Sequence, residues 1–364
     1  MSLLHALRLK PYSTAIGIHV SPQAAGFLDR LSSRQYLQAD VEVQAAAPVV
    51  RDEIVQGLAA SEKGLYLAVE WVKHNALSPY PNLCLGACLM VRAFRNPHLL
   101  DEIASADTLP KPAHDSLKKS RDAFARAMLR GPELPDPHAW MVWLELLARA
   151  PKEELYRQYA AAVSKDYLHW PAHRNYFFTT TERHGGSRDE MLSFVREATT
   201  HTPPGAPIHI LTACAHNELF HSAARKSGLK PAGALMKRKD FAASVSNAFR
   251  LWLAGPPEKA ASLVKQHSEN VAFYGLNQFA AAAYLAGAIP EARFAIEALE
   301  GRIDRFPWAW MAQDSRESAN PAFAFDRICR ELDIDPRKYL NRRPRTDPAA
   351  KAARSPGSRN WAGR

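Results

Sequence analysis

The segment from His216 to His221 carries the residue types of a zinc-hydrolase helix. Zinc on such a helix requires two histidines four residues apart, so that both lie on one face. Here the two histidines are five residues apart, which places them about 140° apart around a helix. His209 shares a face with His216, but Glu218 then points toward the opposite face. We therefore predict no bound metal, and we keep His209, His216 and Glu218 as weak polar candidates only.

Two glycines before Ser187 form a second candidate site, because the N-terminus of a helix can bind a phosphate. No strand precedes these glycines and no lysine follows them, unlike in a P-loop. Asp189 and Glu190 already place negative charge on the first turn. The pattern favours a loop that enters a helix through a capping box of Ser187 and Glu190. His184, just before the glycines, is a further weak polar candidate.

The four cysteines, Cys84, Cys88, Cys214 and Cys329, fit neither a disulfide framework nor a four-thiolate zinc site. Cys84 and Cys88 share a helical face among leucines, which is typical of small thiols buried in a core. The sequence thus predicts no catalytic group and no cofactor.

Aromatic residues are dense in the middle of the chain, and they form the candidate interaction surface. Its members are Trp140, Trp143, Tyr156, Trp170 and Tyr176. They could form the core of two helix pairs, or line a concave groove for a peptide, and both interpretations stay open.

Apolar residues recur at helical spacing along most of the chain, for example at Val50, Ile54 and Leu58. Ser21-Pro22 and Asp136-Pro137 are typical of helix starts. No segment shows the sustained alternation of paired strands. We therefore predict an all-α fold whose short loops connect antiparallel neighbours.

A repeat with an offset of 32 residues lies in the C-terminal third. Its first copy holds Ala248, Trp252, Gly255 and Ala260, which recur as Ala280, Tyr284, Gly287 and Ala292. The offset is close to the roughly 34 residues of a tetratricopeptide unit. It predicts a tetratricopeptide-like solenoid of degenerate antiparallel helix pairs.

The central region contains four distinctive segments: Trp170-Pro171-Ala172-His173, Arg183-His184-Gly185-Gly186-Ser187, Pro204-Gly205-Ala206-Pro207 and Ala215-His216-Asn217-Glu218. In these segments the chain is similar to uncharacterised bacterial proteins that have a tetratricopeptide-like helical domain of unknown function. Members usually have tryptophan where His184 stands. The resemblance covers residues 65–310 and implies the helical architecture, with no established activity.

The basic character of the chain belongs to its C-terminal end. The net charge is +10, of which residues 337–364 contribute +8. We predict three regions: a loosely ordered N-terminal segment with a short helix (1–47), a helical-repeat domain (48–335) and a basic disordered tail (336–364). No signal peptide and no apolar run of membrane-spanning length is evident, so we expect a cytoplasmic protein without membrane contact.

The sequence favours a non-enzymatic scaffold that binds a protein or peptide of unknown identity. One alternative is a nucleic-acid-associated protein that uses the basic tail. Another is a hydrolytic or metal enzyme centred on His209, His216 and Glu218.

Overall fold

The computed structural model describes residues 15–16, 21–93, 111–254 and 267–335. These residues are almost entirely helical, which confirms the predicted all-α class. The first half contains β1 (Ala15–Ile16), α1 (Pro22–Ser32), α2 (Tyr36–Ala45), α3 (Pro48–Ala60), α4 (Gly64–His74), α5 (Pro79–Ala93), α7 (Lys111–Arg130), α8 (Asp136–Leu147) and α9 (Lys152–Val163).

The second half begins with α10 (Trp170–Thr180) and continues in the same helical manner. Its further elements are η3 (Glu182–His184), α11 (Arg188–Thr200), η4 (Pro207–His209), α12 (Ile210–Ser227), α13 (Leu229–Met236), α14 (Lys239–Leu253), α16 (Glu269–Ala286), α17 (Ile289–Ala298), β2 (Arg302–Ile303), η6 (Trp308–Met311), α18 (Ser315–Ala319) and α19 (Ala322–Glu331).

Four helices of the described ranges begin at side-chain caps, and one of them is α18, where the Asp314 carboxylate accepts a bond from the Glu317 amide. The Ser21 hydroxyl accepts a bond from the Ala24 amide at the start of α1, and Ser187 accepts one from the Glu190 amide at the start of α11. His169 caps α10 in the same way through its Nδ1. Only half of the predicted capping box forms, because the Glu190 carboxylate instead pairs with Lys152 at 2.6 Å.

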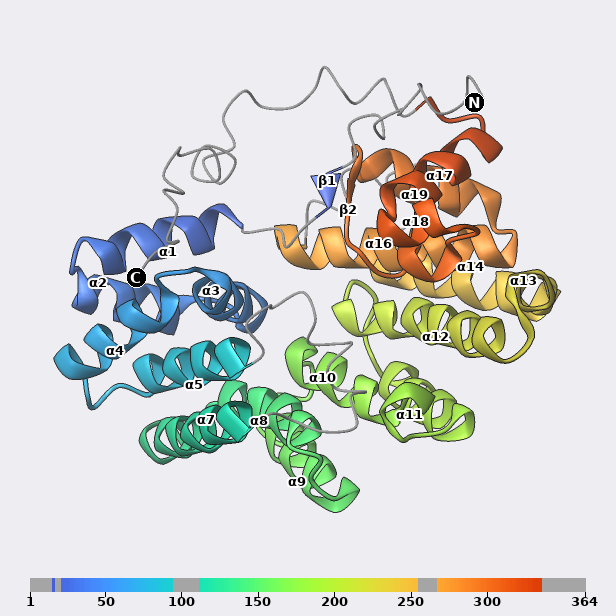
Figure 1. Ribbon diagram of the computed structural model, residues 1–364. Helices are drawn as coiled ribbons and strands as arrows, with labels where there is room; N and C mark the ends of the chain where they lie inside the picture. Colours follow the sequence, from blue (N-terminus) through green and yellow to red (C-terminus); the bar gives the residue numbers. More distant parts are fainter. Residues whose placement is uncertain (1–14, 17–20, 94–110, 255–266, 336–364) are drawn as a thin grey trace, which may run out of the picture.

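Consecutive helices pack against one another along a curved path. Figure 1 shows the chain running from α3 and α5 through α8 and α10 to α12 and α16, so that α3 and α16 lie on facing sides. Contacts between distant parts of the sequence join these sides. Glu53 Oε1 in α3 accepts a bond from the Asn270 amide in α16 at 3.1 Å, and β1 pairs in parallel with β2.

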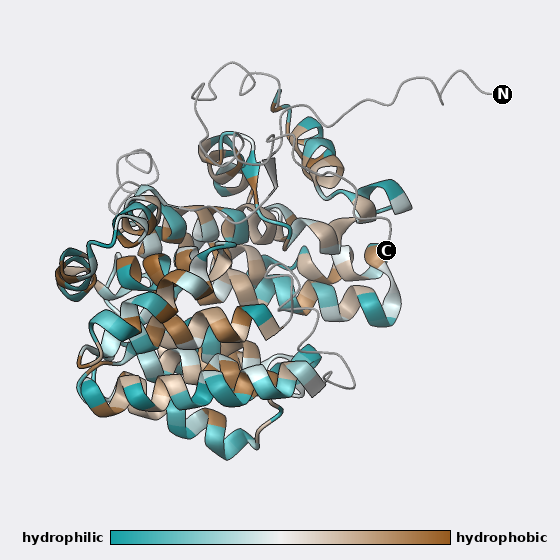
Figure 2. Ribbon diagram, turned by 60° about the vertical axis from the view of Figure 1, so that its left-hand side comes forward, coloured by the Kyte–Doolittle hydropathy of each residue, from teal (hydrophilic) through white to brown (hydrophobic). Residues whose placement is uncertain are grey.

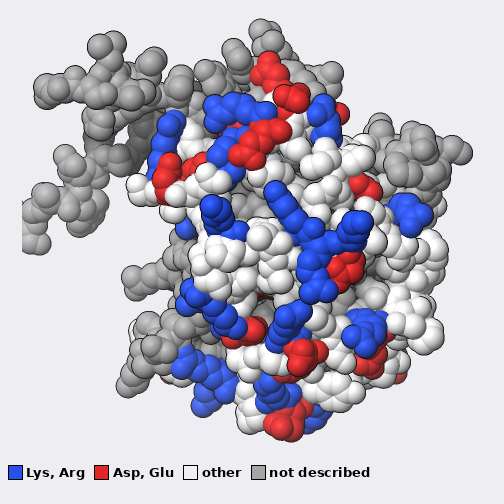
Figure 3. All heavy atoms as spheres, turned by 90° about the vertical axis from the view of Figure 1, so that its right-hand side faces the viewer, with Lys and Arg blue, Asp and Glu red and all other residues white. Residues whose placement is uncertain are grey.

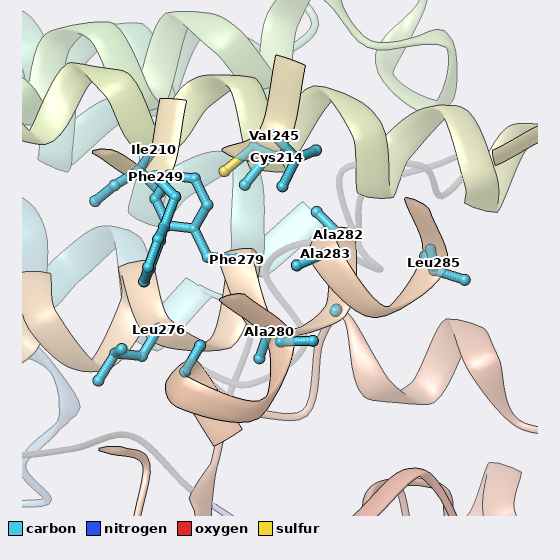
Figure 4. Packing of buried hydrophobic residues seen from close by; sticks show 14 of the residues in the cluster. Ile210, Cys214, Val245, Phe249, Leu276, Phe279, Ala280, Ala282, Ala283 and Leu285 are labelled. Carbon is cyan, nitrogen blue, oxygen red and sulfur yellow. The ribbon is translucent and has the colours of Figure 1, made fainter. Parts of the chain in front are cut away.

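Two large apolar cores stabilise this arrangement. One lies among α1 to α8, and the other extends from α10 to α19. In Figure 2 the helices carry alternating apolar and polar patches, as amphipathic helices do. Figure 4 shows the second core where α12, α14 and α16 meet: Phe249 packs edge-on against Phe279, 5.1 Å between ring centroids, beside Ile210 and Cys214.

The second copy of the predicted repeat is the helix pair α16–α17, joined at Gly287 with φ +79°. In the first copy, α14 ends at Ala254, which also has a positive φ of 55°. The second helix expected for that copy falls in residues 255–266, which lie outside the described residues. Only the second copy of the predicted repeat therefore lies wholly within the described residues.

The N-terminal segment differs from the prediction of a loosely ordered region with one short helix. Residues 22–45 form two helices, α1 and α2, that pack on the first core. Phe27, Leu31, Ala39 and Val43 are fully buried there. Their helical spacing supplies the apolar face that the prediction overlooked. The predicted basic tail lies outside the described residues.

Candidate functional site

A cavity of about 280 Å³ lies on the inner side of the curved helical path. Its lining is rich in aromatic side chains, and the wall also carries charged groups from both halves of the chain. The aromatic members are Trp140, Trp143, Trp170, Phe177, Phe178, Phe273, Tyr274, Phe306 and Trp310. The charged members are Asp52, Glu53, Arg174, Arg183, Glu218, Asp304 and Arg305.

One face of α3 forms a wall of this cavity. Its lining residues recur at three- and four-residue steps from Val49 to Ala60, which is the spacing of a single helical face. Helix α8 contributes Trp140 and Trp143 to the lining. Helix α10 contributes Trp170 and, one turn later, Arg174 and Asn175. The segment before and within η6 closes the opposite side. The cavity is thus built by elements that are distant in sequence.

Three consecutive charged residues on α3, Arg51, Asp52 and Glu53, are buried, with 7%, 4% and 3% of their surface exposed. Arg51 points away from the cavity and pairs with Asp136 of α8 at 2.6 Å. Its guanidinium also donates to the carbonyl oxygens of Val43 and Ala46. Arg51 therefore fixes α3 against α2 and α8.

His169 supports the same junction from the start of α10. Its Nδ1 accepts the Ala172 amide bond, so the proton lies on Nε2, which faces Asp136 at 3.7 Å. Burial alone would raise the pKa of Asp136, but His169 and Arg51 outweigh it and the pKa is lowered. Asp136 is therefore an anion held between two donors.

Asp52 is only partly satisfied. Its Oδ2 accepts from Gln56 at 2.6 Å and pairs with Arg174 of α10 at 3.2 Å. Its Oδ1 is buried and has no hydrogen-bond partner among the described residues. Burial raises the pKa of Asp52, and the nearby Arg174 offsets this only in part. A buried carboxylate oxygen without a donor is energetically costly.

Glu53 lies beside Asp52 on the cavity wall. Burial raises its pKa, and the Ser268 hydroxyl, the Asn270 backbone amide and the Ser21 hydroxyl are donors that lower it again in part. Among the described residues Glu53 forms no ion pair. By contrast, Asp52 pairs with Arg174, and Glu218 pairs with Arg183. The Oδ1 atom of Asn270, also on the wall, is buried and finds no hydrogen-bond partner among the residues that the structure describes.

Arg183 of η3 is held in the opposite part of the cavity. It pairs with Glu218 of α12 at 2.9 Å, and its guanidinium lies 5.4 Å from the ring centroids of both Phe178 and Trp310. The imidazole of His221 stacks on the indole of Trp310, with the two ring centroids 4.6 Å apart. Burial, with help from Arg183 and Arg225, lowers the pKa of His221 to about 4. This imidazole is neutral at pH 7.

Cys214 is the thiol on the cavity wall, and its Sγ lies 3.4 Å from the Tyr274 hydroxyl oxygen. Burial raises the pKa of Cys214 to about 12. A thiol must ionise to act as a nucleophile, so Cys214 is inert at neutral pH. The cavity is therefore suited to holding an apolar or aromatic group and hydrogen-bond donors.

The five predicted interaction residues fall into two sets. Trp140, Trp143 and Trp170 line the cavity. Tyr156 and Tyr176 lie in a separate aromatic cluster between α9, α10 and α11, where their ring centroids are 6.0 Å apart. Tyr156 is 57% exposed there. The five aromatic residues that form one group in the sequence thus lie in two places in the structure: the cavity and an outer aromatic cluster.

The weak polar candidates do not converge. His209 contacts the Pro203 carbonyl oxygen through Nε2, and His216 donates from Nδ1 to the Thr212 carbonyl. His184 contacts the Thr181 hydroxyl at 2.9 Å, and Glu218 pairs with Arg183. In the described ranges no three His, Cys, Asp or Glu side chains are placed to hold a metal ion. The proposed centre of His209, His216 and Glu218 is therefore not assembled.

Sequence reasoning missed most of the polar wall, including Asp52, Glu53, Arg174 and Arg183. One signal was available on α3. Three consecutive charged residues span about 200° of a helix, so they cannot all face away from an apolar core. Arg174 and Arg183 carry no comparable signal, because lone arginines on helices are usually solvated.

Basic and acidic side chains are interspersed on the face seen in Figure 3. That view shows no continuous basic stripe of the kind that tracks a nucleic-acid backbone. Within the described part of the chain, no helix combines the length and apolar character needed to span a bilayer. No protein-family model and no curated protein matches the sequence.

Proposed function

We propose that this chain is a helical-repeat scaffold that binds a peptide segment of a protein partner in its central cavity. The proposal includes a tetratricopeptide-like solenoid of degenerate helix pairs, and kinship with the bacterial helical proteins that the sequence resembles. The curved succession of packed helices and the complete pair α16–α17 support it.

One observation carries the proposal: nine aromatic rings line a single cavity on the inner side of the curve. Aromatic side chains dominate the energetics of interfaces, because they bury a large area at little conformational cost. The volume of about 280 Å³ lies just below the roughly 300–1,000 Å³ of drug-sized sites. The space therefore suits one or two side chains of a peptide.

A substitution that fills the cavity tests this function without removing any existing contact. Ala60 lies on the α3 wall, whereas Ala243 is exposed on α14 and outside the cavity. We expect wild type and Ala243→Trp to enrich the same peptides from a phage-displayed random library. Ala60→Trp should lose at least tenfold in affinity for those peptides, measured by calorimetry. Equal binding by Ala60→Trp, or no enrichment by wild type, would refute the proposal.

A further inference from the structure

The α3 wall of the cavity has acceptors that lack donors. Asp52 Oδ1 and Asn270 Oδ1 are both buried and have no hydrogen-bond partner in the described part of the chain, and both residues line the cavity. Glu53, which follows Asp52 in the wall, accepts a bond from the Asn270 amide and lies near the hydroxyls of Ser268 and Ser21. A bound group that supplies several donors would satisfy these oxygens and recover the free energy lost on their burial.

The charges in the cavity favour a cation at this wall. Arg174 and Arg183 are each engaged by a carboxylate, Asp52 and Glu218 respectively. The Arg305 guanidinium lies over the Phe306 ring, 5.7 Å from its centroid. Glu53 is left with no cationic partner in the described ranges. A cation beside Glu53 would balance its buried charge.

The rings of the cavity suit the same occupant. Trp140, Trp143 and Trp170 line it together with the α3 carboxylates. Indole faces attract ammonium and guanidinium groups, and the attraction strengthens where water is excluded. A neutral apolar side chain would use these rings but would leave Asp52 Oδ1 and Asn270 Oδ1 unpaired.

We infer that the cavity takes a basic side chain, lysine or arginine, of the bound peptide, with Asp52, Glu53 and Asn270 accepting its donors. This inference rests on the proposed peptide-binding function. An ammonium offers three donors and a guanidinium five, and either matches the acceptors of this wall.

The test uses capped pentapeptides, acetyl-Ala-Ala-X-Ala-Ala-amide, with X as lysine, arginine, norleucine, phenylalanine or glutamate. Binding to the full chain is followed by tryptophan indole NMR shifts, since four tryptophans line the cavity. We expect the lysine or arginine peptide to bind at least tenfold more tightly than norleucine. Comparison of the two basic peptides distinguishes ammonium from guanidinium recognition.

Glu53→Gln keeps an acceptor for the Asn270 amide and removes the charge. We expect it to reduce the preference for the basic peptide to less than threefold, and Asp52→Asn to weaken the same peptide. Glu154→Gln, on α9 and paired with Arg157 outside the cavity, is the matched control and should retain the preference. Norleucine or phenylalanine binding as tightly as lysine and arginine would overturn the inference while leaving peptide binding intact. Failure of every peptide, together with no library enrichment, would refute the proposed function itself.

Discussion

His173 is a buried imidazole at the centre of the outer aromatic cluster. Its Nε2 donates to the Tyr167 carbonyl oxygen at 2.8 Å, and its Nδ1 accepts from the Tyr159 hydroxyl. Burial lowers the pKa of His173 to about 4. The folded state therefore holds this ring neutral across a pH range in which the unfolded chain binds a proton.

The pH dependence of stability follows from this difference. Between pH 6.5 and 4 the unfolded state binds more protons at this site, so the free energy of unfolding falls as the pH falls. The free energy of unfolding falls between pH 7 and 4.5, and we expect His173→Gln to make this fall smaller by about 2 kcal/mol, as measured by urea unfolding. His201→Gln, at an exposed position, should leave the slope unchanged. Parallel slopes for wild type and His173→Gln would contradict this account.

Glu53 gives the opposite dependence of stability on pH: its contribution becomes less favourable as the pH rises. Because burial raises its pKa, its ionised form destabilises the fold above that pKa. We expect Glu53→Gln to raise the melting temperature slightly at pH 8, with the gain vanishing as the pH falls through the raised pKa. Thermal melts across this range check the prediction. A melting temperature that drops at pH 8 would show that the carboxylate is stabilised by contacts with its neighbours.

At this scale the sequence identified apolar and aromatic partners better than polar ones. Trp140 and Trp170 were placed among the interaction residues because aromatic density is visible in the sequence. The pairing of Asp52 with Arg174 was not visible, because the two residues are brought together by the packing of α10 on α3. Ion pairs between helices depend on tertiary geometry, which helical periodicity does not encode.

At the scale of the helices, α14 and α16 each end at a residue in the left-handed conformation. Gly287 ends α16 with φ +79°, and a Cβ added there would meet no other atom within 4 Å. A larger residue there would therefore not crowd the partner helix, and only the backbone conformation resists substitution. We expect Gly287→Val to cost about 1–2 kcal/mol and Gly287→Asn much less, because asparagine tolerates this region. Equal losses for both variants would indicate crowding after all.

Ala254 occupies the same left-handed conformation at the end of α14, with φ 55°. It is exposed, so little burial is lost if its methyl group is removed. We expect Ala254→Gly to stabilise the chain by about 1 kcal/mol, since glycine adopts this conformation without the Cβ penalty. Chemical denaturation measures the gain, and a destabilised variant would show that the Ala254 methyl group has a packing role.

The repeat was detectable because small residues and glycine recur at turns and close helix contacts, where local geometry dictates residue type. The packing of α1 and α2 on the first core was not predicted from the sequence, because these helices have few apolar residues. Phe27 and Leu31 are separated by one helical turn, and only the presence of a facing core shows that they are buried.

At the scale of the whole molecule, the N-terminal helices belong to the folded body. Removal of residues 1–45 would expose the part of the first core that Phe27, Leu31 and Val43 cover. Burial of such side chains contributes about 1.5–3 kcal/mol each. We expect this truncation to lower the melting temperature by at least 10 °C or to abolish folding. A chain that ends at Leu340 should melt as the full chain does, as the sequence of the tail predicts.

Nucleic-acid retention by the tail is also checked with the chain that ends at Leu340. We expect that chain to lose any binding to nucleic acid that the full chain shows at low salt, because most of the net charge lies in the removed segment. Gel retardation with a short duplex measures this binding. Equal retention by both chains would place the basic surface on the helical body.

The meeting of α3 with α16, and of β1 with β2, also affects the order of events during folding. Bringing together Glu53 and Asn270, which are 217 residues apart, costs about 5 kcal/mol of chain entropy. The two cores consist of contacts that are much closer in sequence, so each can form before the ends of the curve meet. Closure of the curve by α3 and α16 is therefore expected to be a late step of folding, because it carries the largest cost in chain entropy.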